Sequence, residues 1–309
     1  MWRLSAFGHA PGIPGAGKVD LQMELIIDVL MEAVLDTLKL IPFLFVTYLA
    51  MEALEHKAGE HSERAVRRAG AAGPVIGALL GVVPQCGFSA AAATLYAGRV
   101  ITLGTLFAVF LATSDEMLPI LIAEQAPLDM IAKVLAIKVA VGIVAGFAID
   151  LALRLARRAG DEHMHIHELC EQEHCDCDDG VLKSSIKHTA QVSLFIFLIT
   201  LVLGALIALV GEDTLASFMS GNPALSVVAS SLVGLIPNCA ASVAITELYL
   251  EGALGAGAMV GGLLTSAGIG LLVLFRTNRP MRDNVAIAAV LFAIGAITGL
   301  VLTAFGLTL

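Results

Sequence analysis

Long apolar stretches alternate with short polar connections along almost the whole chain. A helix needs about 20 mostly apolar residues to cross the hydrocarbon core of a bilayer. Stretches of about that length recur at 26–53, 75–97, 101–123, 130–153, 189–210, 223–250, 253–275 and 284–308. Four of them lie on each side of one hydrophilic loop, so the chain is predicted to be a tandem repeat of a unit of about 150 residues. The pattern predicts an all-α polytopic membrane protein with a first membrane repeat over 26–158, a loop over 159–182 and a second membrane repeat over 183–308.

The same polar motif interrupts one apolar stretch in each half. Gly-x-x-Pro-amide-Cys-x-x-Ser occurs at 81–89 and again at 234–242, a shift of 153 positions (237 − 84). Proline removes an N–H and clashes with the preceding turn, so the helices are predicted to break at Pro84 and Pro237. Broken backbone is tolerated at membrane depth only where protein or a water-filled cavity covers it. One polar break in each half is typical of a transporter's substrate site.

The distribution of basic residues predicts the topology. Lys and Arg cluster at 57–68, at 154–158 with Lys183 and Lys187, and at 276–282, whereas 124–129 and 211–222 contain none. Cytoplasmic loops carry the excess of basic residues, and this distribution is satisfied if 75–97 and 223–250 are re-entrant hairpins. Each half then has three transmembrane helices plus one re-entrant helical hairpin, about ten helices in total, arranged as an inverted repeat with both termini outside. Four crossings in each half is the alternative, and it would place Arg99 outside.

Composition supports the membrane class and excludes others. The 309 residues are 58% hydrophobic and 15% charged, with a mean hydropathy of +0.88; soluble domains are about 25% charged. A formal net charge of −9 without a basic amphipathic tract argues against a nucleic-acid partner. Residues 1–24 contain no apolar core of a cleavable signal peptide.

Candidate ligands for a transported substrate lie in the two breaks and in a polar run of the third segment. They are Gln85, Cys86, Ser89, Ser114, Asp115, Glu116, Asn238, Cys239 and Ser242. Adjacent carboxylates inside a membrane segment cost about 2.5–3.5 kcal/mol each, so Asp115 and Glu116 are expected to hold a cation, a proton or a partner such as Lys133 or Lys138. Neighbouring helical residues point in different directions, and Asp115 is the one expected to face the site. Structural alternatives remain for the others, because an intramembrane Cys is often a small buried hydrophobe and Ser89 and Ser242 could serve only to bond carbonyls freed by the breaks.

The hydrophilic loop has the composition of a metal-binding segment. Residues 161–179 contain four His, three Cys and eight carboxylates, a mixture typical of transition-metal binding. The candidate ligands are His163, His165, His167, Cys170, His174, Cys175 and Cys177. They lack a zinc-finger spacing, which favours a labile collector on the cytosolic face; a solvated acidic linker is the alternative. No fixed cofactor is expected.

The paired Pro-Gln-Cys-Gly and Pro-Asn-Cys-Ala breaks, the Thr-Ser-Asp-Glu-Met run at 113–117 and the His/Cys-rich loop resemble the ten-helix heavy-metal exporters. This bacterial and archaeal family is also labelled manganese transporter or arsenic efflux protein. The resemblance extends over about 26–308 and implies a multi-pass protein of the inner (plasma) membrane that exports a metal or metalloid. Ala240 replaces Gly87 in the second copy of the break, so the two copies differ at their tips.

The sequence therefore predicts a secondary transporter that exports a divalent transition metal by alternating access, coupled to protons. Oxygen ligands favour Mn²⁺, and the thiols extend the range to Zn²⁺, Co²⁺ or Ni²⁺. An arsenite or organoarsenical permease that uses Cys86 and Cys239 is the alternative. Without a Gly-x-x-x-x-Gly-Lys motif ATP is not the expected driver, and without His-Glu-x-x-His or Gly-x-Ser-x-Gly the chain is not expected to be an enzyme. Besides the ion and protons, the expected partner is the lipid bilayer, and a homo-oligomer is compatible with the pattern.

Overall fold

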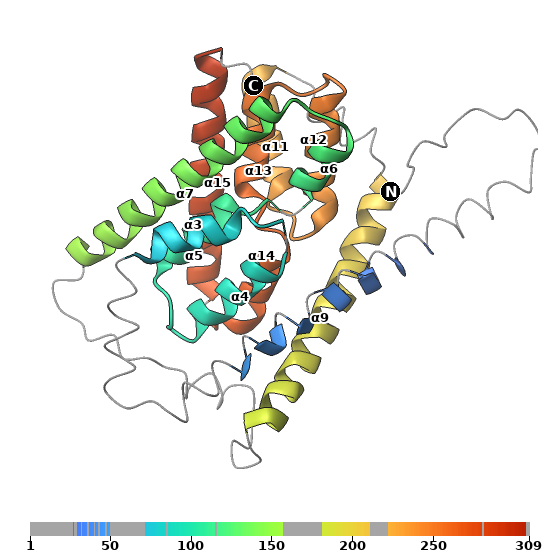
Figure 1. Cartoon of the computed structure of the whole chain (residues 1–309), viewed down its shortest axis with the longest axis vertical. Helices are drawn as coiled ribbons and strands as arrows, with labels where there is room; N and C mark the ends of the chain where they lie inside the picture. The colour runs from blue at the N-terminus through green and yellow to red at the C-terminus, as the bar shows by residue number, and fades with distance from the viewer. Residues whose placement is uncertain are drawn as a thin grey trace, which may run out of the picture.

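The computed structural model describes residues 72–84, 86–114, 116–156, 181–210, 222–279 and 281–306, together with part of 27–49. The regular secondary structure of these residues is entirely helical (Figure 1). Gln85, Asp115 and the whole candidate metal loop at 161–179 lie outside the described residues.

The two halves repeat one order of helices. The first half contains α3 (Gly73–Gly81), α4 (Cys86–Ala97), α5 (Leu103–Ala112), α6 (Met117–Ala123) and α7 (Leu128–Ala156). The second contains α11 (Pro223–Gly234), α12 (Cys239–Leu250), α13 (Ala256–Thr265), α14 (Ile269–Thr277) and α15 (Met281–Ala304). The starts of α12, α13 and α15 follow those of α4, α5 and α7 by 153 positions (239 − 86, 256 − 103, 281 − 128). Each half is thus two interrupted helices followed by one long helix.

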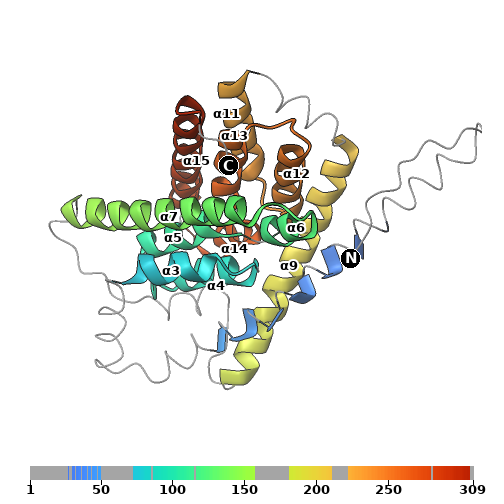
Figure 2. The same cartoon turned by 45° about the horizontal axis from the view of Figure 1, so that its top comes forward.

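The repeat extends to the helix that opens each half. In the second half this is α9 (Val181–Val210), and in the first it is the partly described stretch 27–49, which runs alongside α9 in both views (Figures 1 and 2). Buried positions in the two helices correspond at a shift of 152 (185 − 33): Ala33, Thr37, Leu44 and Tyr48 against Ser185, Thr189, Ile196 and Thr200. The hydroxyls of Thr37 and Thr189 both donate to the carbonyl four residues earlier, at 2.8 and 2.7 Å.

Small residues let the helices of each half approach closely. An ideal Cβ on Gly146 would lie 2.6 Å from the carbonyl oxygen of Gly104, and one on Gly142 would lie 2.9 Å from that of Ala108. These pairs join α5 and α7, and the equivalent pairs Gly257–Gly299 and Gly261–Gly295 join α13 and α15. Small-residue contacts spaced by four are typical of membrane helix interfaces. In these pairs the residue number in one helix falls as the residue number in the other rises. Helix α7 is therefore antiparallel to α5, and α15 is antiparallel to α13.

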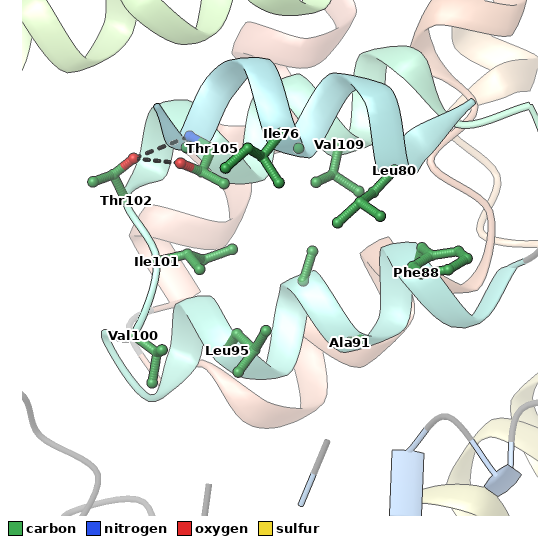
Figure 3. Close-up of a pocket in the computed structure, with 13 residues that line it drawn as sticks. Ile76, Leu80, Phe88, Ala91, Leu95, Val100, Ile101, Thr102, Thr105 and Val109 are labelled. Atoms are coloured by element: carbon green, nitrogen blue, oxygen red, sulfur yellow. Dashed lines mark hydrogen bonds between the residues drawn. The ribbon is translucent and has the colours of Figure 1, made fainter. Parts of the chain in front are cut away.

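The first interrupted helix of the first half folds back on itself. Close contacts of α3 with α5 advance together along both helices, from Gly77 at Thr105 to Gly81 at Val109, so α3 and α5 are parallel. The intervening α4 runs in the opposite direction: Leu80 lies near Phe88, and Ile76 lies opposite Leu95 (Figure 3). The chain therefore reverses at the break that contains Pro84.

The second interrupted helix of each half contacts the other half. Helix α14 packs against α4, and α6 packs against α12, while α5 also meets α13. The buried hydrophobic core accordingly contains residues of both halves, such as Phe107 and Phe110 of α5 with Met259 and Leu263 of α13. The two repeats thus form one interlocked body.

Within the described part of the chain, five helical segments are long and apolar enough to cross a membrane by length and composition. They are Leu103–Ala123, Leu128–Leu155, Ser185–Val202, Ala256–Thr277 and Met281–Ala304. The segment Ala256–Thr277 is 94% buried, whereas Leu128–Leu155 and Met281–Ala304 are 22% and 28% buried. The broken span α13–α14 therefore lies at the centre, and the long helices α7 and α15 present apolar surface outwards.

Candidate functional site

The predicted breaks at Pro84 and Pro237 are both confirmed as gaps between helices. Helix α3 ends at Gly81 and α4 begins at Cys86, while α11 ends at Gly234 and α12 begins at Cys239. The glycine at each C-terminus has a steric cause, since a Cβ on Gly81 would lie 2.7 Å from the carbonyl oxygen of Val109. Each first arm thus ends at a glycine whose ideal Cβ would meet a backbone carbonyl oxygen of the neighbouring helix, that of Val109 or that of Gly262.

Asn238 caps the N-terminus of α12. Its side chain is 1% exposed, and its Oδ1 accepts a hydrogen bond of 3.2 Å from the backbone N–H of Ala240. A side-chain oxygen at this position satisfies one of the free N–H groups of the first turn. The carboxamide predicted as an ion ligand is therefore already engaged by α12, although an amide oxygen has a second lone pair.

The other polar residues of the second break are buried within α12. Cys239 is 3% exposed and takes part in no disulfide within the described part of the chain. Ser242 donates to the carbonyl of Cys239 at 2.8 Å, and Thr246 donates to the carbonyl of Ser242 at 2.7 Å. Hydroxyls that bond a carbonyl of the preceding turn serve the helix itself. The equivalent Ser89 in α4 is fully buried and lies against Gly270 of α14.

Helices α5 and α13 are interrupted at equivalent Thr-Ser pairs. After α5 ends at Ala112, the hydroxyls of Thr113 and Ser114 donate to the carbonyls of Val109 and Ala112, at 2.8 and 2.9 Å. Glu116 is the partly exposed N-cap residue of α6. After α13 the chain passes through Gly268, whose φ of 53° is in the left-handed region that favours glycine. Neither pair of half-helices is continuous.

Hydroxyl groups gather beside the end of α13. Thr265 donates to the carbonyl of Ser231 at 2.8 Å, which ties α13 to α11. The side chains of Ser230 and Ser231 are fully buried, and their hydroxyl oxygens have no hydrogen-bond partner among the described residues. Buried polar groups are normally bonded, so among the described residues the hydrogen-bonding capacity of these two hydroxyls is unmet.

Lys138 of α7 is buried in the same region. Its side chain is 1% exposed, and its Nζ donates a 2.7 Å hydrogen bond to the carbonyl oxygen of Leu263 in α13. Leu263 belongs to the last turn of α13, where carbonyls lack a partner within the helix. The ammonium thus caps a broken helix of the other half of the molecule.

Helix register places Lys138 at the end of α5 as well. The α5–α7 contacts pair Gly104 with Gly146 and Ala108 with Gly142, so the next turn pairs Ala112, the last residue of α5, with Lys138. At the other end of α5, the Asp150 carboxylate accepts hydrogen bonds of 2.8 Å from Gly104 N and from the Thr102 hydroxyl. Helix α7 therefore places a carboxylate at the positive end of the α5 dipole and an ammonium at the level of its negative end.

The position of Lys138 was not recognised as special from the sequence, although a signal existed. The sequence offers both Lys133 and Lys138 as partners of the carboxylates, whereas in the structure Lys133 pairs with Asp129 at 3.2 Å on the exposed face of α7. Buried residues of α7 recur every four positions, at Met130, Val134, Lys138, Gly142, Gly146 and Asp150. Because Gly142 and Gly146 mark the packed face, a lysine four residues before Gly142 had to lie on it too.

The structure also contains an apolar cavity of about 250 Å³ between the arms of the first hairpin and α5. Residues from both arms line it, among them Ile76, Leu80 and Leu95 (Figure 3). Ala92 lies in this lining, and the equivalent residue of the second half is Ile245 (245 − 92 = 153), whose Cδ1 lies within 2.8 Å of an ideal Cβ on Gly262. In the second half the isoleucine side chain fills the space that alanine leaves open in the first half. None of the predicted site residues lines the cavity.

No group of three or more His, Cys, Asp or Glu side chains in the described part of the chain is arranged to hold a metal ion. The described break residues instead offer backbone carbonyls, hydroxyls, one amide and one thiol, together with the partly exposed carboxylate of Glu116.

The chain matches one protein-family model in two overlapping stretches, residues 22–210 and 176–308. The model is ArsP_2, described as "Putative, 10TM heavy-metal exporter". No curated protein and no solved structure matches the chain significantly. The first stretch alone covers more than half of the chain, and the all-helical architecture with several membrane-length helices agrees with a ten-helix family. The chain therefore belongs to the ArsP_2 family of heavy-metal exporters.

Proposed function

We propose that this protein is a secondary transporter that exports a divalent transition metal, Mn²⁺ first and Zn²⁺, Co²⁺ or Ni²⁺ next, by proton-coupled alternating access. The observation that carries the proposal is the pair of interrupted spans, α5–α6 and α13–α14, whose first halves end beside the same buried ammonium. Interrupted helices at the junction of two repeats are where transporters bind ions. The loop at 159–182 would collect the ion on the cytosolic face.

The inverted repeat and the re-entrant hairpins form part of this proposal. Reversal of the chain at Pro84 supports a first hairpin that enters and leaves on one face. Three crossings and one such hairpin in each half would give the halves opposite orientations, as alternating access in inverted repeats requires. The protein would then lie in the bacterial or archaeal inner membrane with both termini outside.

Oxygen chemistry favours Mn²⁺ in this arrangement. Asp115 and Glu116 follow the end of α5, and carbonyl oxygens end α5 and α13. Carboxylate and carbonyl oxygens suit Mn²⁺, and the thiol of Cys239 would extend the range to softer ions. In this scheme Asp115 binds the ion and exchanges protons.

Ion content of living cells tests the proposal most directly. Cells that lack their own exporters are loaded with Mn, Zn, Co, Ni or As, with and without this gene, and their content is measured by elemental analysis. Expression is expected to lower cellular Mn most. Unchanged content of all five elements would refute the exporter assignment.

An arsenite or organoarsenical permease is the second candidate, favoured by the family name ArsP_2 and by the buried thiol of Cys239. Trivalent arsenic binds thiolates, so under this reading Cys86→Ser and Cys239→Ser should abolish arsenic export while leaving Mn²⁺ export measurable. Asp115→Asn should do the reverse. The comparison is made by efflux from the same cells, with protein amounts matched by immunoblot.

Thiol substitutions that leave arsenic export intact would exclude the soft-ligand mechanism. If Asp115→Asn leaves Mn²⁺ export intact, the proposed coupling role of that carboxylate is excluded instead.

A further inference from the structure

Lys138 occupies the position in which a transported cation would find its ligands. Its ammonium donates to the carbonyl of Leu263 at 2.7 Å, in the last turn of α13. By the register of α5 and α7, the same residue lies level with the last residue of α5. The negative ends of two broken helices therefore flank one side chain, and such ends are the groups that coordinate cations in interrupted membrane helices.

A lysine at this depth needs a reason, because charged side chains inside a membrane bundle are costly and mark functional sites by default. Among the described residues, Lys138 and Asp150 are the buried Lys, Arg, Asp or Glu side chains. Asp150 is accounted for as the cap of α5. The position equivalent to Lys138 in the second repeat (138 + 153) is Leu291, which is fully buried, so the fold itself does not require a charge there.

We propose that Lys138 is a positioning residue that competes with the transported cation for the ends of α5 and α13, an inference that rests on the proposed function. While the carrier returns without a metal ion, the ammonium supplies the positive charge that balances these helix ends. An entering metal ion repels the ammonium and displaces it. Lys138 thereby couples occupancy of the site to the contact between α7 of one repeat and α13 of the other.

Removal of a competitor should strengthen ion binding. In Lys138→Met, which keeps the length of the side chain without its charge, the Kd for Mn²⁺ measured on purified full-length protein is expected to fall about tenfold. Lys133→Met is the matched control, because Lys133 lies on the exposed face of the same helix and pairs with Asp129; its Kd should stay within about twofold of wild type. A Kd in Lys138→Met that is unchanged or higher would overturn the proposal, since a purely structural lysine predicts weaker binding.

Transport modes supply an independent readout. In vesicles with Mn²⁺ on both sides, isotope exchange does not require the unloaded carrier to return, whereas net efflux does. Lys138→Met is expected to keep exchange within about threefold of wild type and to lose net efflux about tenfold or more. Equal loss of both modes, or retention of both, would overturn the proposal. Wild-type vesicles that move no Mn²⁺, Zn²⁺, Co²⁺, Ni²⁺ or arsenite would instead refute the proposed function, and the inference with it.

Should Lys138→Met fail to fold, the wild-type protein carries the test. Acylation of Lys138 by isotope-labelled acetic anhydride, followed by mass spectrometry, is expected to change about threefold on saturation with Mn²⁺. Lys133 in the same sample is the internal control and should not respond. Equal acylation of Lys138 with and without Mn²⁺ would overturn the proposal.

Discussion

At the scale of single residues, polar side chains around the second break bond the backbone that the break exposes. Asn238 caps α12, Ser242 bonds the carbonyl of Cys239, and Thr265 bonds the carbonyl of Ser231. Hydrocarbon cannot satisfy these groups, so each unbonded one would cost several kcal/mol. Motif residues that suggest ligands in the sequence therefore also have a structural task.

Asn238→Ala should lower the free energy of unfolding by about 1–2 kcal/mol, because the N–H of Ala240 loses its buried cap. Asn238→Ser, which restores a capping oxygen, should stay within about 0.5 kcal/mol of wild type. The measurement is thermal denaturation of the protein in detergent. Equal stability of wild type and Asn238→Ala would show that the cap contributes nothing.

Asn222 offers a matched control for ion binding. It caps the exposed start of α11 through the N–H of Ala224 at 3.1 Å. Asn222→Ala should reduce stability by about 0.5–1 kcal/mol without changing transport. Loss of transport in Asn238→Ser at wild-type stability would show that the amide of Asn238 has a second role as an ion ligand.

At the scale of helices, equivalent pairs pack differently in the two halves. Helices α4 and α14 approach so closely that a Cβ on Gly270 would lie 2.6 Å from the Cβ of Ser89 and 2.8 Å from its backbone carbon. Helix α14 begins 152 positions after α6 (269 − 117). In the equivalent pair, α12 and α6, Leu118 therefore holds the position of Gly270 (270 − 152). Glycine permits a backbone approach that leucine blocks, so the asymmetry of the two contacts has its cause in the sequence.

Gly270→Ala should destabilise the protein by about 1–3 kcal/mol, because the added methyl group meets backbone and the helices must separate. Gly255→Ala is the control: no atom lies within 4 Å of its ideal Cβ, and its φ of −76° suits alanine. Its effect should stay within about 0.5 kcal/mol. Denaturation midpoints in detergent compare the two, and an equal shift in both variants would contradict the close α4–α14 contact.

At the scale of the whole molecule, the proposed inverted repeat requires equivalent turns to lie on opposite faces of the membrane. The turn after α4 and the turn after α12 have the same backbone hydrogen bonds: Val100 N bonds Leu95 O and Ala253 N bonds Leu248 O, both at 2.9 Å. Local geometry is thus the same, and only the orientation of the repeats distinguishes the two turns.

In a background without the five native cysteines, Val100→Cys should resist a membrane-impermeant maleimide applied to intact cells, whereas Ala253→Cys should react. Glu124→Cys is the external control and Arg282→Cys the cytosolic one, as the distribution of basic residues predicts. Labelling is read by gel shift before and after lysis. Four crossings in each half would give the halves the same orientation, and both turn cysteines would then react from the same face.

The two proline breaks can be located from the sequence, whereas the contacts between distant residues of the site cannot. Pro84 and Pro237 mark both breaks in the sequence, because each is a local departure from an apolar pattern. The interruptions after α5 and after α13 are not predicted, because the apolar pattern presents 101–123 and 253–275 as continuous spans. The role of Lys138 was missed: its significance lies in contact with Leu263, 125 positions away, which no local pattern encodes. The predicted roles of Gln85, Asp115 and the metal loop stay predictions, since these residues lie outside the described ones.

The sequence by itself determined that the chain is a membrane protein, that it consists of two similar halves, and that one helix of each half is interrupted at a proline. Those features depend on segment length, apolar composition and the missing N–H of proline, all of which act within a few residues. Only the tertiary structure decided that α14 packs on α4, that α6 packs on α12, and that an ammonium from one half caps a broken helix of the other. Such pairings depend on the shapes of surfaces far apart in the chain, such as the close approach of α4 and α14 that Gly270 permits.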